Sequence, residues 1–360
     1  MLKLIDKYII WKYLSTFFFT VLIFTMITVI IDFSEKIDNF MNEKAPTDLI
    51  IWAYYMNFIP FLHLMLFPVY NLIAVIFFTS RMAYNSEIIS ILNGGVSFTR
   101  LMRPYLIGAS VIGGIMLLAS HFFMPIGNRT RIAFENQYIY KYDKESQTKD
   151  VHIYLTPTTK AYIRHYSIRD SVARDLILEH IEDGELKSKL IAKRADYNVE
   201  TEKWKLTNYT IRSFEGKKEE YITGINLDTA INLTPGDLER RDNLKMTMTS
   251  PELVSFLKSE KKRGTGKALL FEIELYQRTA NAFTILILTC IGMVIAARKI
   301  RGGTGLHLAF GALLGAVYIL FNQVSTTLST NANFHPMLGA WTPNIIFLII
   351  LFLLLRTAQK

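Results

Sequence analysis

The sequence predicts a membrane protein with six transmembrane α-helices and an extracytoplasmic all-β, jelly-roll-like domain inserted between helices 3 and 4. Three observations support this fold class. The 360 residues are 51% hydrophobic and only 20% charged, which is too apolar for an ordinary soluble domain. Charged residues vanish in six blocks, each long enough to cross a bilayer. Between the third and fourth blocks lies a long polar segment whose hydrophobic residues alternate as in β-strands.

The six uncharged blocks give the expected helices. A helix needs roughly 20 apolar residues to cross about 30 Å of hydrocarbon. The blocks that meet this requirement cover residues 12–31, 49–80, 104–124, 279–297, 304–330 and 338–355. The second block is too long for one perpendicular span and contains Pro60 and Pro68, so we expect it to be tilted or kinked.

The first block follows a basic start formed by Lys3, Lys7 and Lys12, as a signal peptide would. A small-x-small cleavage site does not follow the block, because residues 32–35 are Asp, Phe, Ser and Glu. We therefore expect the block to remain in the protein as a signal anchor.

The distribution of Lys and Arg predicts the orientation, because positive charges accumulate in cytoplasmic flanks. The segments before span one, between spans two and three, between four and five, and after six hold 11 Lys and Arg, against 2 in the short flanks on the other side. Both termini are therefore expected in the cytoplasm. The expected domains are 1–125 (spans one to three), 126–249 (the β domain), 250–268 (a connecting elbow helix) and 269–360 (spans four to six).

The net charge of +9 does not indicate a nucleic-acid partner. Residues 126–268 contain 26 of the 40 Lys and Arg, but their 22 Asp and Glu reduce the net charge of this segment to +4. The segment therefore has a mixed surface without a basic stripe.

The external segment contains six runs with β-type alternation or β-branched residues. They cover residues 151–155, 161–166, 171–181, 186–197, 203–214 and 221–233, with turn signals at Asp183-Gly184, Glu215-Gly216 and Pro235-Gly236. Six strands predict a sandwich or a jelly roll. A short helix follows, with Ser250 as the expected N-cap and Pro251 at the first helical position.

No set of residues suited to catalysis or metal binding is visible in the sequence. The single cysteine, Cys290, cannot form an intrachain disulfide, and His63, His121 and His307 lack the spaced partners of a metal site. The run Gly-Thr-Gly-Lys at 264–267 departs from the GxxxxGK[ST] pattern of a phosphate loop, so we interpret it as a linker. We expect a protein that is not an enzyme and holds no metal or cofactor.

The cytoplasmic segment 85–93 predicts a short amphipathic helix. Asn85 or Ser86 is the expected cap, Glu87 suits the first turn, and Asn93-Gly94 is expected to end the helix in a left-handed conformation. Its apolar residues include Ile88, Ile91 and Leu92. Two roles fit equally well: the helix lies in the headgroup layer, or it inserts into a groove of a cytoplasmic partner.

Two further sets of residues have alternative interpretations. Gly311 and Gly315 form a GxxxG face in span five, suited either to internal packing or to a partner helix. Four cations lie just outside the membrane and are either solvated flank residues or binding groups for lipid phosphates. They are Lys36, Lys44, Arg129 and Arg131.

Taken in order, these segments resemble those of the lipopolysaccharide-export permeases, the LptF/LptG family. The similarity covers nearly the whole chain and is strongest in 86–92 followed by Gly95-Val96-Ser97. The other segments that carry it are 5–9, Phe67-Pro68, 278–280, Arg298 with 301–305, 336–338 and 341–344. The first residues of the chain lean towards the LptG type.

The resemblance implies a subunit of an ABC transporter that extracts lipopolysaccharide from the bacterial inner membrane for export to the outer membrane. Two such permeases would pair around a cavity, with spans one and five at lateral gates. A separate cytoplasmic ATPase dimer would bind ATP and dock on a coupling helix at 85–93, with Glu87, Ile88, Ile91 and Leu92 as contacts. The β domain would be a periplasmic jelly roll that passes lipid to bridge proteins of similar fold.

One departure from the family pattern concerns lipid phosphates. LptG-like members tend to carry several lysines at the outer end of span one, whereas this chain has Asp32, Glu35 and Asp38 with only Lys36 among them. Headgroup binding is therefore expected to shift to Arg129 and Arg131, or the lipid carries fewer phosphates.

Two alternatives to this function remain. The first is a permease of another ABC class, of the lipoprotein-exporting or mechanotransmitting type. The second is a membrane scaffold or receptor without transport activity, which would have neither an ATPase partner nor a continuous cavity.

Overall fold

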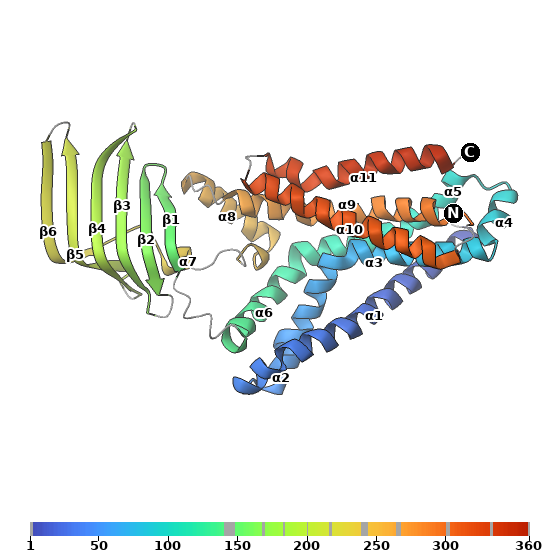
Figure 1. The fold of residues 1–360 in the computed structure, drawn as a ribbon, viewed down its shortest axis with the longest axis horizontal. Helices are drawn as coiled ribbons and strands as arrows, with labels where there is room; N and C mark the ends of the chain where they lie inside the picture. The colour runs from blue at the N-terminus through green and yellow to red at the C-terminus, as the bar shows by residue number, and fades with distance from the viewer. Residues whose placement is uncertain are drawn as a thin grey trace. The chain divides into compact units, whose positions relative to one another are not determined.

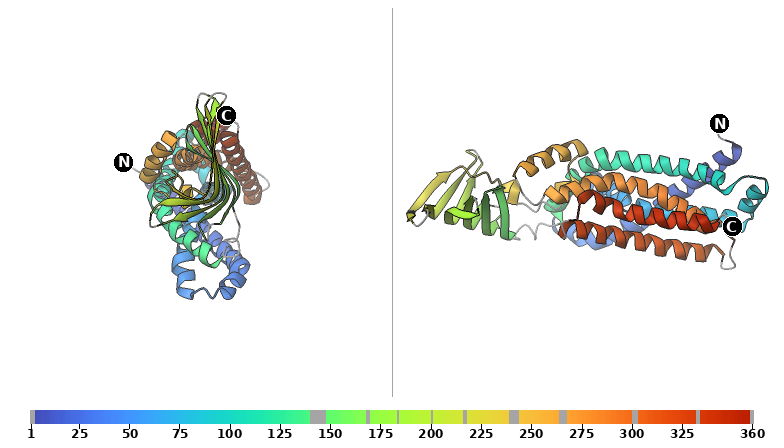
Figure 2. Two further views of the ribbon diagram at one scale, coloured as in Figure 1. Left: turned by 90° about the vertical axis from the view of Figure 1, so that its left-hand side faces the viewer. Right: turned by 90° about the horizontal axis from the view of Figure 1, so that it is seen from above.

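A computed structural model describes residues 3–139, 148–167, 170–182, 184–199, 201–215, 218–238, 244–263, 268–299, 303–331 and 334–358. The chain forms two compact units (Figures 1 and 2). The helical unit comprises Met1–Asp38, Pro46–Arg131 and Glu272–Lys360, and the β unit comprises Asn39–Ala45 and Ile132–Phe271. The linker expected at 264–267 and the turn residues Asp183 and Gly216 lie outside the described residues.

Within the described part of the chain, six long apolar helices match the six predicted spans. The first, third and fourth spans are clearly longer than the uncharged blocks, because these helices continue into polar flanks. The helical elements are α1 (Leu4–Asn42), α2 (Thr47–Leu49), a π-helical turn η1 (Ile50–Tyr55), α3 (Met56–Tyr84), α4 (Glu87–Asn93), α5 (Phe98–Leu118), a second π-helical turn η2 (Ala119–Phe123), α6 (Met124–Tyr138), α9 (Ala268–Ala296), α10 (Gly303–Asn331) and α11 (Pro336–Ala358).

The second span is not a single regular helix. A π-helical turn, η1, precedes α3, and Pro60 and Pro68 lie inside α3. Each proline removes one backbone hydrogen bond from the helix. The structure thus contains the irregularities expected of this long block.

A buried set of hydrogen bonds joins α1, α3 and α9. The hydroxyl of Tyr13 bonds to the side-chain oxygen of Asn71 and lies 2.9 Å from Oγ1 of Thr289. The Asn71 amide in turn donates to Thr289 Oγ1 at 2.8 Å and to the backbone oxygen of Ile285 at 3.2 Å. Because hydrocarbon offers no water to replace these partners, the hydrogen bonds fix how the three helices face one another.

The two glycines of span five pack inside the chain. A Cβ on Gly311 would lie 2.4 Å from Cδ1 of Ile76, and one on Gly315 would lie 3.4 Å from Cγ1 of Val69. Ile76 and Val69 both belong to α3, which is the neighbour of α10 in the helical unit. The small residues therefore allow α10 to approach α3 closely.

The β unit contains one six-stranded antiparallel sheet in which every strand pairs with the next in sequence (Figure 1). The strands are β1 (Thr148–Thr156), β2 (Thr159–Ser167), β3 (Val172–Glu182), β4 (Glu185–Asn198), β5 (Lys203–Glu215) and β6 (Lys218–Thr229). The sheet is strongly twisted, as antiparallel sheets of this size are (Figure 2). The all-β insertion is confirmed, with the described strands in up-and-down order.

The core of the β unit lies on one face of the sheet. Trp204 of β5 is fully buried, packs against Tyr197 of β4 and donates its indole N–H to the backbone oxygen of Leu233 at 2.7 Å. Leu233 and Leu238, the latter at the end of α7 (Pro235–Leu238), cover the same core. This covering segment explains why β6 ends at Thr229, four residues before the predicted end of the strand.

The elbow helix α8 (Ser250–Arg263) starts one residue earlier than predicted. Its capping interactions involve Thr249: Glu252 accepts a hydrogen bond from the Thr249 N–H at 2.8 Å, and Thr249 O accepts one from Leu253. The prediction that Ser250 is the N-cap is therefore wrong. Glu252, at the third helical position, accepts its hydrogen bond from Thr249, the residue before the helix, as in a capping box.

A leucine at Gly311 should destabilise the helical unit. The larger side chain has no space beside Ile76, and overpacking of this kind costs about 1–3 kcal/mol. We expect Gly311→Leu to lower the midpoint of thermal unfolding of the protein in detergent. Gly305→Leu, on the same helix but with nothing within 4 Å of its Cβ position, is the control; an equal loss in both variants would contradict the packing account.

Candidate functional site

The short helix α4 lies in the connection between α3 and α5, at the end of the helical unit where both chain termini lie (Figure 1). Ser86 precedes it with a left-handed φ of 63°, and its side chain makes no capping hydrogen bond. The helix ends at Asn93. Its C-cap residue, Gly94, has φ −74°, and the left-handed residue is Gly95, with φ 83°. The expected side-chain cap and the left-handed Gly94 are thus wrong. The left-handed positions are Ser86, where the side chain makes this conformation strained, and Gly95, where the missing Cβ removes the strain.

The apolar side of α4 faces the helical unit. Ile88 is buried, and Ile91 and Leu92 pack partly buried against the same hydrophobic cluster. Ile89 is 44% exposed, and Ser90 is also exposed. The helix is therefore anchored by three of the predicted contact residues and presents Ile89 and Ser90 outward.

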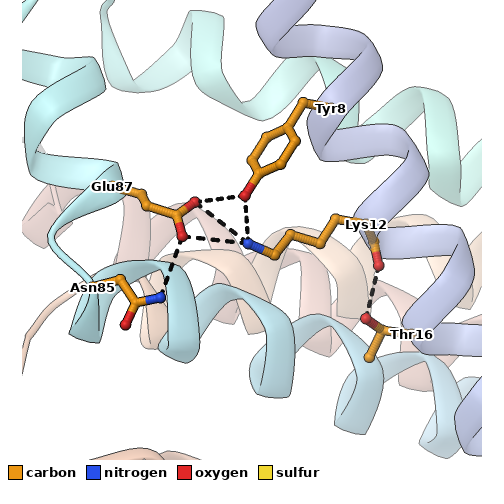
Figure 3. Close-up of polar contacts among 5 residues, drawn as sticks. All are labelled: Tyr8, Lys12, Thr16, Asn85 and Glu87. Atoms are coloured by element: carbon orange, nitrogen blue, oxygen red, sulfur yellow. Dashed lines mark hydrogen bonds and ion pairs between the residues drawn. The ribbon is translucent and has the colours of Figure 1, made fainter.

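Glu87 joins α4 to α1 (Figure 3). The Tyr8 hydroxyl donates to Glu87 Oε2 at 3.0 Å, and Lys12 Nζ lies 3.4 Å from both carboxylate oxygens. Lys12 also donates to the Tyr8 hydroxyl at 2.6 Å, and the Asn85 amide lies 3.4 Å from Glu87 Oε1. Tyr8 and Lys12 are four residues apart on α1, so one face of α1 holds the carboxylate.

A second ion pair fixes the segment just beyond α4. Arg100, in the first turn of α5, donates to the two carboxylate oxygens of Asp6 on α1 at 2.8 and 2.6 Å. The Asp6 side chain is only 5% exposed, and its Oδ2 also accepts the Lys3 N–H at 2.9 Å. The bidentate geometry makes this a directional contact. Together the two ion pairs attach α1 to both sides of the α4 connection.

This arrangement can transmit a displacement. A force on the exposed side of α4 passes to α1 through Glu87 and Lys12, and to the bundle through Ile88. Ile91 and Leu92 add to the contact with the bundle, so the exposed side of α4 is linked to both α1 and the hydrophobic cluster.

The structure places Lys36 in an ion pair. Its Nζ lies 2.5 Å from Asp32 Oδ1, bonds to the Tyr54 hydroxyl and lies 4.9 Å from the centre of the Phe58 ring. The side chains of Lys36 and Asp32 are 16% and 8% exposed. Asp32 therefore neutralises this cation within the helical unit, which weakens its attraction for a phosphate.

The other three candidate cations have different surroundings. Arg131 is 8% exposed; its Nε donates to Asn128 at 3.1 Å and its guanidinium lies 4.2 Å from the centre of the Phe61 ring. Arg129, two residues earlier on α6, is exposed. Lys44 is an exposed turn residue of the β unit, with φ 48°. Arg129 thus offers more accessible charge than Arg131.

Sequence reasoning missed the partners of Glu87 and Asp6. In the sequence, Lys12 serves only as one of the positive charges that predict the orientation in the membrane. Nothing in the sequence connects it with Glu87, 75 residues away. A partner for Asp6 could have been predicted, because an acidic residue at the start of an apolar span requires one. That partner, Arg100, was visible only as one of the cytoplasmic cations.

The chain matches a known family model over nearly its whole length. The family model described as "Lipopolysaccharide export system permease LptF/LptG" matches residues 7–357 of the chain. The match includes α4, all six apolar helices over nearly their full length and the inserted sheet. A search of curated proteins gives no match.

Removal of the Arg100 side chain should destabilise the helical unit. The variant Arg100→Ala leaves the Asp6 carboxylate without its guanidinium, and an unpaired buried acceptor costs about 1–3 kcal/mol. We expect a lower midpoint of thermal unfolding in detergent. Arg103→Ala, an exposed arginine on the same helix, is the control; equal midpoints for the two variants would show that the Asp6 ion pair contributes little.

Proposed function

Because the chain belongs to the LptF/LptG family of lipopolysaccharide export permeases, we propose that it is the permease subunit of an ABC transporter that extracts lipopolysaccharide from the bacterial inner membrane. A separate cytoplasmic ATPase drives the extraction, and this chain is a transport subunit. The observation that carries the proposal is the family match over residues 7–357, which includes an anchored helix at the position suited to coupling.

In this proposal α4 is the coupling helix. Ile88 holds the helix against the bundle, while Ile89 and Ser90 are available to a groove on the ATPase. Closure of the ATPase dimer on ATP displaces α4, and the Lys12–Glu87 ion pair passes this displacement to α1. We favour docking of α4 in a groove of the ATPase over a position of α4 in the lipid headgroup layer, because its most apolar residues already face the protein.

Helices α1 and α10 are the proposed walls of the lipid cavity and its gates. Only 11% of the most apolar stretch of α1 is buried, and 22% of that of α10, against 67% for α9. The exposed apolar side chains include Met26, Ile27, Ile30 and Ile31 on α1 and Phe310, Leu313, Leu320 and Val324 on α10. Faces of this kind suit the acyl chains of the substrate and a second LptF/LptG-type permease.

We place the lipid phosphates nearer to Arg129 than to Lys36. Lys36 is neutralised by Asp32, and Arg131 is largely covered, whereas Arg129 is exposed at the start of α6. A guanidinium binds a phosphate through two parallel hydrogen bonds, so one accessible arginine is a suitable anchor.

The outer edge of β6, with which no described strand pairs, is the proposed contact with the periplasmic bridge proteins. β6 is an edge strand, and Tyr221, Ile222 and Ile225 on it are 62%, 54% and 72% exposed. The opposite edge, β1, contacts α8 within the β unit. A sheet edge with exposed apolar side chains can pair with a strand of another β domain.

Charge reversal at Glu87 should uncouple the permease from its ATPase. We expect Glu87→Arg to lower the amount of ATPase that co-purifies with the permease about tenfold or more, because the partly exposed side chain (28%) would present a cation to the ATPase in place of a carboxylate. Lys12→Gln, which breaks the same internal ion pair and leaves Glu87 in place, is the matched control. Retained ATPase in Glu87→Arg would show that another contact dominates docking.

A charge on the β6 edge should block the bridge contact. We expect Ile225→Lys to reduce co-purification of the periplasmic bridge protein with the permease, because an edge lysine opposes strand addition. Tyr154→Lys, on the opposite edge strand and 46% exposed, should leave the contact intact. The assignment of β6 is wrong if Tyr154→Lys alone breaks the contact.

A further inference from the structure

A cavity of about 280 Å³ lies between α1 and α3, near the end of the helical unit that carries α4. Lys12 and Arg81 provide its cations, Ser15 and Thr16 provide hydroxyl groups, and Trp11 and Phe77 provide its aromatic surfaces. We propose that this cavity binds the phosphate of an anionic phospholipid from the cytoplasmic leaflet. The leaflet assignment rests on the orientation in the proposed function.

The charges in and beside the cavity sum to a positive value. Arg81, in the last turn of α3, has no ion pair with any side chain in the described part of the protein. Lys12 shares its charge with Glu87 at 3.4 Å, so the two cations and one carboxylate leave one net positive charge. An Arg beside a Lys and a hydroxyl group is a suitable set of donors for a phosphate.

The hydroxyl groups differ in what they can offer. Thr16 donates to the backbone oxygen of Lys12 at 2.7 Å, and Tyr8 donates to Glu87, so both are engaged (Figure 3). Ser15 is exposed, and no hydrogen bond of its side chain occurs among the described residues. Ser15 therefore adds a donor next to the two cations.

The apolar surface beyond the cavity identifies a lipid rather than a free phosphate. Trp11, Ser15, Phe18 and Leu22 follow the i, i+4, i+7, i+11 spacing of one helix face. Trp11, Phe18 and Leu22 are 75%, 53% and 51% exposed. Eleven residue steps make about 16 Å, close to half of the roughly 30 Å hydrocarbon core, so one acyl chain can follow this stripe.

The site has a consequence for coupling. The proposed phosphate contacts Lys12, which also holds Glu87 of α4. A bound phospholipid competes with Glu87 for this one cation and thereby loosens the attachment of α4 to α1. Lipid composition in the cytoplasmic leaflet would then adjust the coupling between the ATPase and the permease.

Native mass spectrometry of the full-length protein in mild detergent tests the site. Phosphatidylglycerol is the anionic probe and phosphatidylcholine the zwitterionic one. We expect preferential binding of phosphatidylglycerol, weakened about fivefold in Arg81→Gln, since one cation near a membrane surface contributes about that factor. Arg81→Lys should retain most of the binding. Lys12 is left unchanged because it also holds Glu87.

Arg103→Gln is the matched control, because Arg103 is an exposed arginine at the same end of the helical unit but does not line the cavity. Equal binding in the parent protein and Arg81→Gln, or equal losses in Arg81→Gln and Arg103→Gln, would overturn the proposal. Displacement of the lipid by inorganic phosphate would also overturn it, in favour of a free-anion site. Lipid binding measured in detergent does not depend on membrane orientation or on transport. Failure of the proposed function would therefore leave this result intact.

Discussion

The buried hydrogen bonds among Tyr13, Asn71 and Thr289 are the constraint on which the helical unit depends. They are buried within three of the apolar helices, where an unpaired amide or hydroxyl group is costly, so α1 can rotate against α3 and α9 only by breaking both bonds of Tyr13. The orientation of α1 that they fix also brings Tyr8 and Lys12 to Glu87. The buried hydrogen bonds of Tyr13 thus help to position the contacts that Tyr8 and Lys12 make with Glu87.

The two ends of α1 use their charges differently. At the α4 end, Asp6 and Lys12 pair with residues of other helices, which ties α1 to the connection that carries α4. Towards the other end, Lys36 pairs with Asp32 on the same helix and with Tyr54. The first arrangement suits transmission of force between elements. The second stabilises the end of a long helix without offering a free cation to a ligand.

The spans and strands were predictable, because charge-free length and residue alternation are local properties of a sequence. Predicted boundaries were less accurate where tertiary packing decides them, as at β6, which ends early because Leu233 turns to accept the Trp204 hydrogen bond. The position of α4 was predictable, but its anchoring was not. The ion pair between Lys12 and Glu87 and the burial of Ile88 arise from distant segments that only the fold brings together.

The central claim is that this chain is the membrane half of an ATP-driven lipid exporter. Affinity purification of the unmodified protein from its native membrane, with identification of all bound proteins and lipids, tests this claim most directly. We expect a soluble ABC ATPase, a second six-span permease and lipopolysaccharide. Recovery of the chain alone and free of lipid, from a sample in which other membrane complexes survive, would contradict the account and favour a scaffold or receptor.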